Sequence, residues 1–226
     1  MSAGQGAGRP IAIFDLDRTI TTIGTFTPFM LYGAWRLKPW RLLLLPAGAV
    51  LLALTAAKAI SRKTLKTDMM RLFLGQVPEE RLRPVIRDFI ALFRHKYLRP
   101  GALEVMAAER ARGARILLAT ASYDFYAADF AHALGMDGCI ATPSLRRDGK
   151  LLPGLPGENC YGAEKLRRVE AALNLPPGTA RPEIVFYSDD KSDLPCLLWA
   201  DRGVVVNPKP AFARIAAGRG LEVVAW

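Results

Sequence analysis

The stretch Ile11-Ala12-Ile13-Phe14-Asp15-Leu16-Asp17-Arg18-Thr19 decides the fold of this chain. Its first four residues are apolar without alternation, which is typical of a short strand buried on both faces of a parallel sheet. Two carboxylates and a hydroxyl follow at once, at Asp15, Asp17 and Thr19. Ligands bind at the ends of strands in an open α/β sheet, so these groups predict a site for a hard cation or a phosphate. An acidic turn without a ligand is the alternative.

Three later segments also place polar residues after apolar runs or at the start of a helix. They are Thr120 after Ile116–Ala119, Lys165 near the start of a predicted helix over Gly162–Leu173, and Asp189, Asp190 and Asp193 after Ile184–Tyr187. With the first stretch, these segments resemble the four motifs of the haloacid dehalogenase superfamily, in the family's order and across residues 10–210. The shared order makes a purely structural explanation of the four segments unattractive.

The alternation of strands with helices predicts an α/β fold with a doubly wound parallel sheet. The resemblance implies a Rossmann-like haloacid dehalogenase core with an inserted helical cap. We therefore expect residues 1–20 and 100–226 to form the catalytic core and residues 21–99 to form the cap. The length of 226 residues suits this arrangement. Three scattered cysteines argue against a disulfide framework or a zinc site.

The resemblance also implies a phosphatase that works through an aspartyl-phosphate, with Asp15 as nucleophile and Asp17 as general acid and base. It implies Mg²⁺ as cofactor, held by Asp15, the backbone carbonyl of Asp17 and Asp189. Thr120 and Lys165 would bind the phosphoryl oxygens. The remaining expected site residues are Ser122 as a substrate contact and Thr19, Asp190 and Asp193 as supporting groups. Asp190 has an alternative role as a helix N-cap.

Charge is distributed unevenly along this basic chain, whose formal net charge is +10. Residues 18–67 contain no Asp or Glu, and they hold eight cations: Arg18, Arg36, Lys38, Arg41, Lys58, Arg62, Lys63 and Lys66. This asymmetry favours an acidic partner such as an anionic membrane surface or a phosphorylated substrate. Nucleic acid is not expected, because a surface that binds it would interleave basic residues with exposed aromatics along a polar face and would not contain sixteen uncharged residues.

Residues 42–57 form an uncharged run of sixteen residues with basic flanks. As a helix the run spans about 24 Å, less than the roughly 30 Å hydrocarbon core of a bilayer. Pro46 and Gly48 also disfavour one straight helix. We expect the run to lie in the membrane interface, where Trp and Lys or Arg anchors occur. An inner helix of the cap is the alternative.

The substrate follows less directly from the sequence. Phosphoserine phosphatases resemble this chain in the position of the insertion, but they have Ser-Gly-Gly where this chain has Ala121-Ser122 after Thr120. The acid-free stretch 18–67 also offers no carboxylate for the ammonium group of phosphoserine, whereas phosphoserine phosphatases usually place one soon after the first motif. The combination of core, apolar segment and cap size resembles the bacterial phosphatidylglycerophosphate phosphatase C group. We therefore expect a lipid phosphatase, peripheral or interfacial on the cytoplasmic side of the inner membrane.

Two alternatives to the lipid phosphatase stay open. One is a soluble cytoplasmic phosphatase of a small metabolite, including phosphoserine. The other is a module without enzymatic activity that binds anionic lipid. The sequence makes no prediction of oligomeric state.

Overall fold

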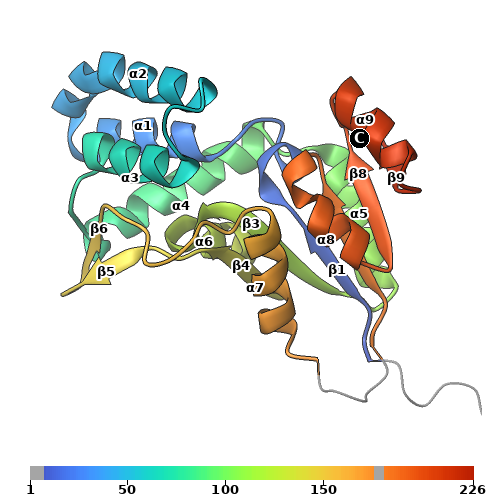
Figure 1. Ribbon diagram of the computed structural model, residues 1–226. Helices are drawn as coiled ribbons and strands as arrows, with labels where there is room; N and C mark the ends of the chain where they lie inside the picture. Colours follow the sequence, from blue (N-terminus) through green and yellow to red (C-terminus); the bar gives the residue numbers. More distant parts are fainter. Residues whose placement is uncertain (1–7, 176–180) are drawn as a thin grey trace, which may run out of the picture.

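A six-stranded parallel sheet forms the centre of the computed structural model, which describes residues 8–175 and 181–226 (Figure 1). Its strand order is β4-β3-β1-β7-β8-β9, with neighbouring strands parallel throughout. The strands are β1 (Ile11–Phe14), β3 (Arg115–Tyr123), β4 (Gly138–Thr142), β7 (Ile184–Ser188), β8 (Arg202–Val206) and β9 (Glu222–Val224). The opening stretch of the sequence therefore lies in the middle of the sheet, between β3 and β7.

Helices cover both faces of this sheet. They are α5 (Pro100–Ala111), α6 (Asp124–Ala133), α7 (Ala163–Leu173), α8 (Leu194–Trp199) and α9 (Pro210–Ala217). Successive residues of β1 enter different hydrophobic clusters: Ala12 and Phe14 pack on the side of α5 and α6, whereas Ile11 and Ile13 pack on the side of α7, α8 and α9. The unbroken apolar run thus reflects burial on both faces, and the doubly wound prediction is confirmed.

Between β1 and β3 the chain forms a helical layer beside the carboxyl end of the sheet (Figure 1). A turn over Leu16–Ile20 leads into α1 (Phe26–Leu37), a 3-10 helix (Pro39–Leu44), α2 (Leu45–Ala56), α3 (Arg62–Phe73), β2 (Val77–Pro78) and α4 (Glu79–Lys96). The apolar stripe of α4 is buried, as its spacing predicts, and includes Leu82, Ile86, Phe89 and Phe93. We refer to residues 21–99 as the cap; its independence as a domain stays a prediction.

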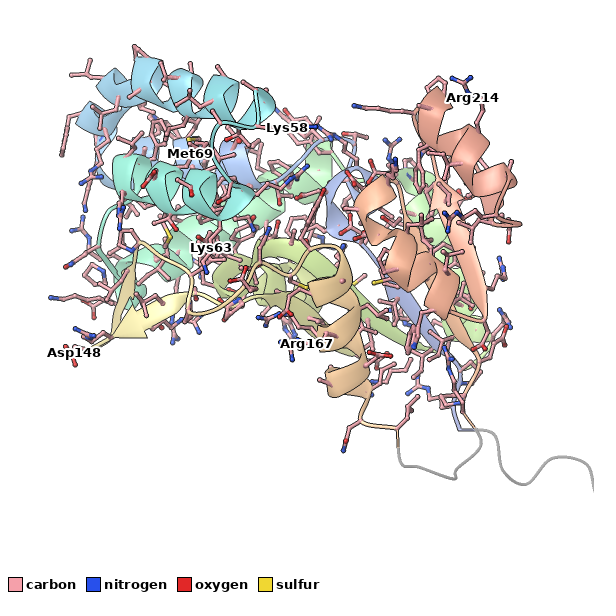
Figure 2. All side chains as sticks on the ribbon, in the orientation of Figure 1. Lys58, Lys63, Met69, Asp148, Arg167 and Arg214 are labelled. Carbon is pink, nitrogen blue, oxygen red and sulfur yellow. The ribbon has the colours of Figure 1, made fainter. Side chains whose placement is uncertain are left out.

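A second, three-stranded antiparallel sheet joins the cap to the later half of the chain. Its hairpin is β5 (Leu145–Arg147) and β6 (Lys150–Leu152), with Asp148 at the tip in a left-handed conformation (Figure 2). The sequence predicts this hairpin from its Asp-Gly turn, and it is confirmed. Its pairing with β2 of the cap is not predicted, because two residues carry no strand signal of their own.

The apolar run lies on the outer side of the cap, where α2 covers α3 (Figure 1). Gly48 lets α2 approach closely, because a Cβ there would stand 2.8 Å from the Phe73 ring, and Met69 lies between the two helices (Figure 2). One helical stretch within the described ranges, Pro39–Ala56, has the length and composition of a membrane span, with mean hydropathy 1.6 and 6% of it buried. An inner helix of the cap would be mostly buried, so the exposure of this stretch argues against that alternative.

Candidate active site

A buried lysine joins two carboxylates at the carboxyl end of the sheet. Lys165, in the first turn of α7, places its Nζ 2.8 Å from Oδ1 of Asp15 and 2.6 Å from Oδ2 of Asp193. Asp193 Oδ2 also accepts a hydrogen bond from Ser188 Oγ at 2.7 Å. Lys165 is 2% exposed, so its charge acts on these carboxylates with little screening by water. Three of the four sequence motifs therefore meet in one cluster.

The protonation equilibria in this cluster reflect burial and charge together. Burial raises the pKa of Asp15 well above its usual range, and Lys165 lowers it again only in part. Burial lowers the pKa of Lys165, but attraction to Asp15 and Asp193 outweighs it, so that the pKa of Lys165 is raised. Burial and the neighbouring Asp190 raise the pKa of Asp189 to about 6. The carboxylates of the site therefore carry more negative charge than the single ammonium group of Lys165 neutralises.

The carboxylate of Asp17 is held by groups from two elements. Oδ1 accepts hydrogen bonds from the backbone N–H and the hydroxyl of Thr25, both at 2.7 Å, and Oδ2 accepts one from Ser122 Oγ at 3.3 Å. Thr25 stands just before α1 and Ser122 lies in β3. Sequence reasoning missed Thr25 and gave Ser122 the role of a substrate contact. In the structure both position Asp17.

The segment after Asp17 turns sharply toward the last acidic motif. Arg18 adopts a left-handed conformation with φ of 64°, which is uncommon for a residue other than glycine. The next residue, Thr19, is fully buried. Its Oγ1 accepts a hydrogen bond from the backbone N–H of Asp189 at 3.0 Å and donates one to Asp189 Oδ1 at 3.4 Å. Thr19 thus positions Asp189, and Asp190 caps the short helix after it by accepting from the Ser192 N–H at 2.8 Å.

Thr120 is fully buried beneath the site. Its Oγ1 accepts a hydrogen bond from the backbone N–H of Ser122 at 3.0 Å, which folds residues 120–122 into a tight turn of the strand. Ala121 of this turn lines the pocket. The structure therefore brings Thr120 to the predicted sheet edge, and its predicted contact with phosphoryl oxygens stays a prediction.

These groups surround a pocket of about 450 Å³ between the sheet and the cap. The predicted site residues that line it are Asp15, Asp17, Lys165, Asp189, Asp190 and Asp193. Its walls also hold residues to which the sequence gave no place in the site, among them Phe26, Leu52, Arg62 and Tyr161. A larger hollow, of about 750 Å³, lies between α4, α6 and the β5–β6 hairpin. We assign the chemistry to the smaller pocket because most of the predicted site residues line it.

Lys66 is a second buried lysine, supplied by the cap. Its Nζ donates to the backbone carbonyl of Ala121 and, at 2.7 Å, to Oδ1 of Asn159. Burial lowers its pKa to about 7, and attraction to Asp17 offsets only part of the effect. The side chain fastens α3 to the turn that follows Thr120. The acid-free composition of residues 18–67 was the one available signal, and it did not distinguish Lys66 from the other cations.

The predicted magnesium set fits the donors that the site presents. It requires two carboxylates, from Asp15 and Asp189, and one backbone carbonyl, from Asp17, all of which are hard oxygen ligands. Within the described part of the chain no three His, Cys, Asp or Glu side chains form a ready metal cluster, and the magnesium set stays a prediction. Burial is the main cause of the raised pKa values of Asp15 and Asp189, and a divalent cation would lower both values by favouring the charged carboxylates.

Comparison with known proteins agrees with this geometry. The family model of the haloacid dehalogenase-like hydrolases matches residues 12–198. Protein CicA of Caulobacter vibrioides is 32% identical over 217 residues, which cover 89% of this chain and 92% of CicA. A Mycobacterium tuberculosis protein named "Probable phosphatase" is 26% identical over 226 residues, covering 96% of this chain and 76% of its own length.

Solved structures extend the comparison. A Bordetella pertussis Tohama I protein of unknown function matches with a TM-score of 0.85 and 26% identity, covering 96% of this chain and 99% of its own. A phospho-aspartyl intermediate analogue of phosphoserine phosphatase shares the fold, with a TM-score of 0.60 and 16% identity over 95% of this chain and 92% of its own. The chain therefore belongs to the haloacid dehalogenase-like hydrolase family, as its motifs indicate, and is a phosphatase of that family.

Proposed function

We propose that this phosphatase is a Mg²⁺-dependent hydrolase of phosphomonoesters on membrane lipids, such as phosphatidylglycerophosphate. It works at the cytoplasmic face of the inner membrane and is held there by α2. The observation that carries the proposal is the position of Leu52, which lies on the exposed apolar helix and also lines the catalytic pocket. An apolar surface and the phosphate-handling groups are thus continuous.

The residues of the pocket account for hydrolysis in two steps. The Asp15 carboxylate attacks phosphorus while the bond to the ester oxygen breaks, and Asp17 gives its proton to that leaving oxygen. Water then attacks the aspartyl-phosphate as Asp17 takes up its proton, and the bond between phosphorus and Asp15 breaks to release inorganic phosphate. Thr25 and Ser122 keep the carboxyl group of Asp17 in place through both transfers. Bound Mg²⁺ supplies charge neutralisation at the phosphoryl oxygens.

Lys165 has a defined part in this scheme. Its ammonium group lies 2.8 Å from the attacking carboxylate and neutralises charge that the dianionic phosphoryl group brings. Asp193 holds Lys165 from the other side at 2.6 Å, so the lysine does not have to reorganise during the reaction. Fixed charges of this kind stabilise a transition state more than mobile ones do, because their orientation is already set.

The exposed large apolar residues of the cap are concentrated in residues 35–54. Leu43 is 82% exposed and Val50 57%, and the other large apolar side chains exposed there are Trp35, Trp40, Leu45, Leu52 and Leu54. By contrast, Leu42 and Leu51 pack against the hydrophobic core. An apolar patch of this kind on a soluble surface marks an interaction site, and the tryptophans suit the headgroup region of a bilayer.

Most of the basic flanks are occupied within the protein. Arg36 pairs with Asp88 at 2.9 Å, Lys63 pairs with Glu158 at 2.9 Å, and Lys38 donates to the backbone carbonyl of Leu74 at 3.0 Å. These contacts leave fewer charges for anionic lipid than the sequence suggests. We therefore expect vesicle binding to depend mainly on apolar burial, with a smaller salt-sensitive part.

The test is a double substitution on the exposed face, Leu43→Glu with Val50→Glu. It should abolish pelleting with vesicles of anionic phospholipid and hydrolysis of phosphatidylglycerophosphate in those vesicles, while turnover of a soluble aryl phosphate continues. The matched control is Leu103→Glu with Leu198→Glu, two exposed leucines on α5 and α8, outside the cap. Vesicle binding and lipid turnover that survive in the double variant would contradict anchoring by α2. A wild-type protein that neither binds the vesicles nor hydrolyses the lipid would contradict the lipid proposal and favour a soluble substrate.

A further inference from the structure

The catalytic pocket contains a cation that the hydrolysis scheme does not use. Arg62, the first residue of α3, lines the pocket wall, and its guanidinium lies 4.4 Å from the centroid of the Tyr161 ring, close enough for a cation–π contact. In the described ranges Arg62 forms no salt bridge, although Lys63 beside it pairs with Glu158. A planar cation is thus held on an aromatic wall and keeps its hydrogen-bond donors available.

The position of Arg62 is not explained by the stability of the helix. A cation in the first turn of a helix meets the positive end of the helix dipole, which is unfavourable. Ser61 already caps this helix by accepting from the Thr64 N–H at 3.0 Å. The same positive end favours an anion that binds beside Arg62.

We propose that Arg62, supported by Tyr161, binds a second anionic group of the substrate: the phosphodiester that joins the headgroup to the glycerol of the lipid. The inference rests on the proposed function and narrows it to lipids that carry both a terminal phosphomonoester and an internal phosphodiester. Guanidinium suits this group because its donors match two phosphate oxygens at once.

The walls of the pocket hold a group suited to each part of such a substrate. Asp15 and Lys165 receive the phosphomonoester, Arg62 receives the diester, and Leu52 with Phe26 offers apolar surface to the acylated glycerol beyond the diester. Phosphatidate, which has a monoester but no diester, leaves Arg62 without a partner. The enzyme therefore prefers phosphatidylglycerophosphate to phosphatidate, and Arg62 is the residue that sets the preference.

The experiment compares kcat/KM for phosphatidylglycerophosphate and phosphatidate in mixed micelles, in the wild type and in Arg62→Gln. The ratio of the two values should fall about tenfold in the variant, through a higher KM for the diester-containing lipid. Arg62→Lys keeps the charge but lacks the planar guanidinium, so it should lose part of the preference for the diester-containing lipid. Tyr161→Leu removes the aromatic ring against which Arg62 lies, and it should also lose part of that preference. Lys63→Gln removes a charge from the same turn and should leave the ratio unchanged, because Lys63 pairs with Glu158 at 2.9 Å.

A second pair of substrates separates this inference from the proposed lipid function. Deacylated phosphatidylglycerophosphate has both phosphates and no acyl chains, and glycerol 3-phosphate has the monoester alone. If the enzyme ignores lipids but Arg62→Gln lowers the preference within the soluble pair, the Arg62 subsite holds and the lipid proposal fails. If the wild type has no preference in either pair, or Arg62→Gln changes the ratio no more than Lys63→Gln does, the subsite is refuted.

Discussion

Replacing Lys66 with methionine should change how the stability of the protein depends on pH. Lys66 is 8% exposed, and its Nζ donates to Asn159 Oδ1 at 2.7 Å. Burial lowers its pKa from the usual 10.5 to about 7. The opposite charges that attract it, chiefly that of Asp17, are too weak to restore the ordinary value. The folded protein therefore accepts a proton on this amine less readily than the unfolded chain does.

The sign of the effect follows from proton counts. Between pH 7 and pH 10 the unfolded chain keeps the Lys66 proton while the folded protein loses it, so the free energy of unfolding rises with pH in this window. Below pH 7 Lys66 is charged in both the folded and the unfolded state, and the folded state bears the full free-energy cost of burying that charge. One pH unit corresponds to about 1.36 kcal/mol, so the gain from pH 6 to pH 9 is about 3 kcal/mol, or roughly 6–12 °C in Tm for a chain of this size. Lys66→Met removes this dependence.

The assay is urea unfolding followed by circular dichroism at pH 6, 7, 8 and 9. The free energy of unfolding of the wild type minus that of Lys66→Met should increase by about 3 kcal/mol from pH 6 to pH 9. Other titrating groups are common to both proteins and cancel in this difference. Lys63→Met, which removes a lysine from the same helix, should run parallel to the wild type. Parallel curves for Lys66→Met as well would refute a depressed pKa at this position.

Four further substitutions test the site and the fold. Asp15→Asn should reduce turnover of an aryl phosphate to background; near-normal turnover would exclude the covalent route. Lys165→Met should slow turnover about 100-fold, equivalent to about 3 kcal/mol, and should cost about 3–5 kcal/mol in urea unfolding, since it leaves buried carboxylates unpaired. Thr25→Val removes one hydrogen bond to Asp17 and should lower kcat about tenfold with little change in KM, as its loss is about 1–2 kcal/mol. Gly203→Ala places a Cβ 2.3 Å from a backbone carbonyl and should lower the free energy of unfolding by about 1–3 kcal/mol in thermal melts.

The strands and the hairpin that could be predicted from sequence are those whose pattern lies in consecutive residues. Ile11–Phe14 and Ile184–Ser188 are buried on both faces, so each reads as an apolar run, and the polar residues after them must reach the same sheet edge. The Asp-Gly turn likewise specifies the β5–β6 hairpin by local backbone preference. The convergence of Asp15, Lys165 and Asp193 follows from strand ends and from the superfamily motifs.

The parts that could not be predicted depend on contacts between distant residues with no local pattern. Thr25 and Ser122 meet Asp17 only once α1 has packed against the sheet, and threonine and serine occur too widely to attract notice. Lys66 resembles the other lysines of its segment until α3 is placed over the turn at Ala121. Arg62 acquires a role only because Tyr161 comes to lie beneath it. In each case tertiary packing, not composition, selects the residue.

The strand pairing between β2 and β6 has a consequence for how the protein reaches its native state. Residues 21–99 leave the ribosome before the hairpin over Leu145–Leu152 has been made, so β2 has no partner when the cap first collapses. The contacts of the cap are complete only when the Glu79 N–H donates to the carbonyl of Gly149 and Lys66 Nζ donates to Asn159 Oδ1. Cap and sheet should therefore behave as one cooperative folding unit, and the Glu79 amide that donates to Gly149 should exchange its hydrogen through global unfolding, at the rate of the central strands.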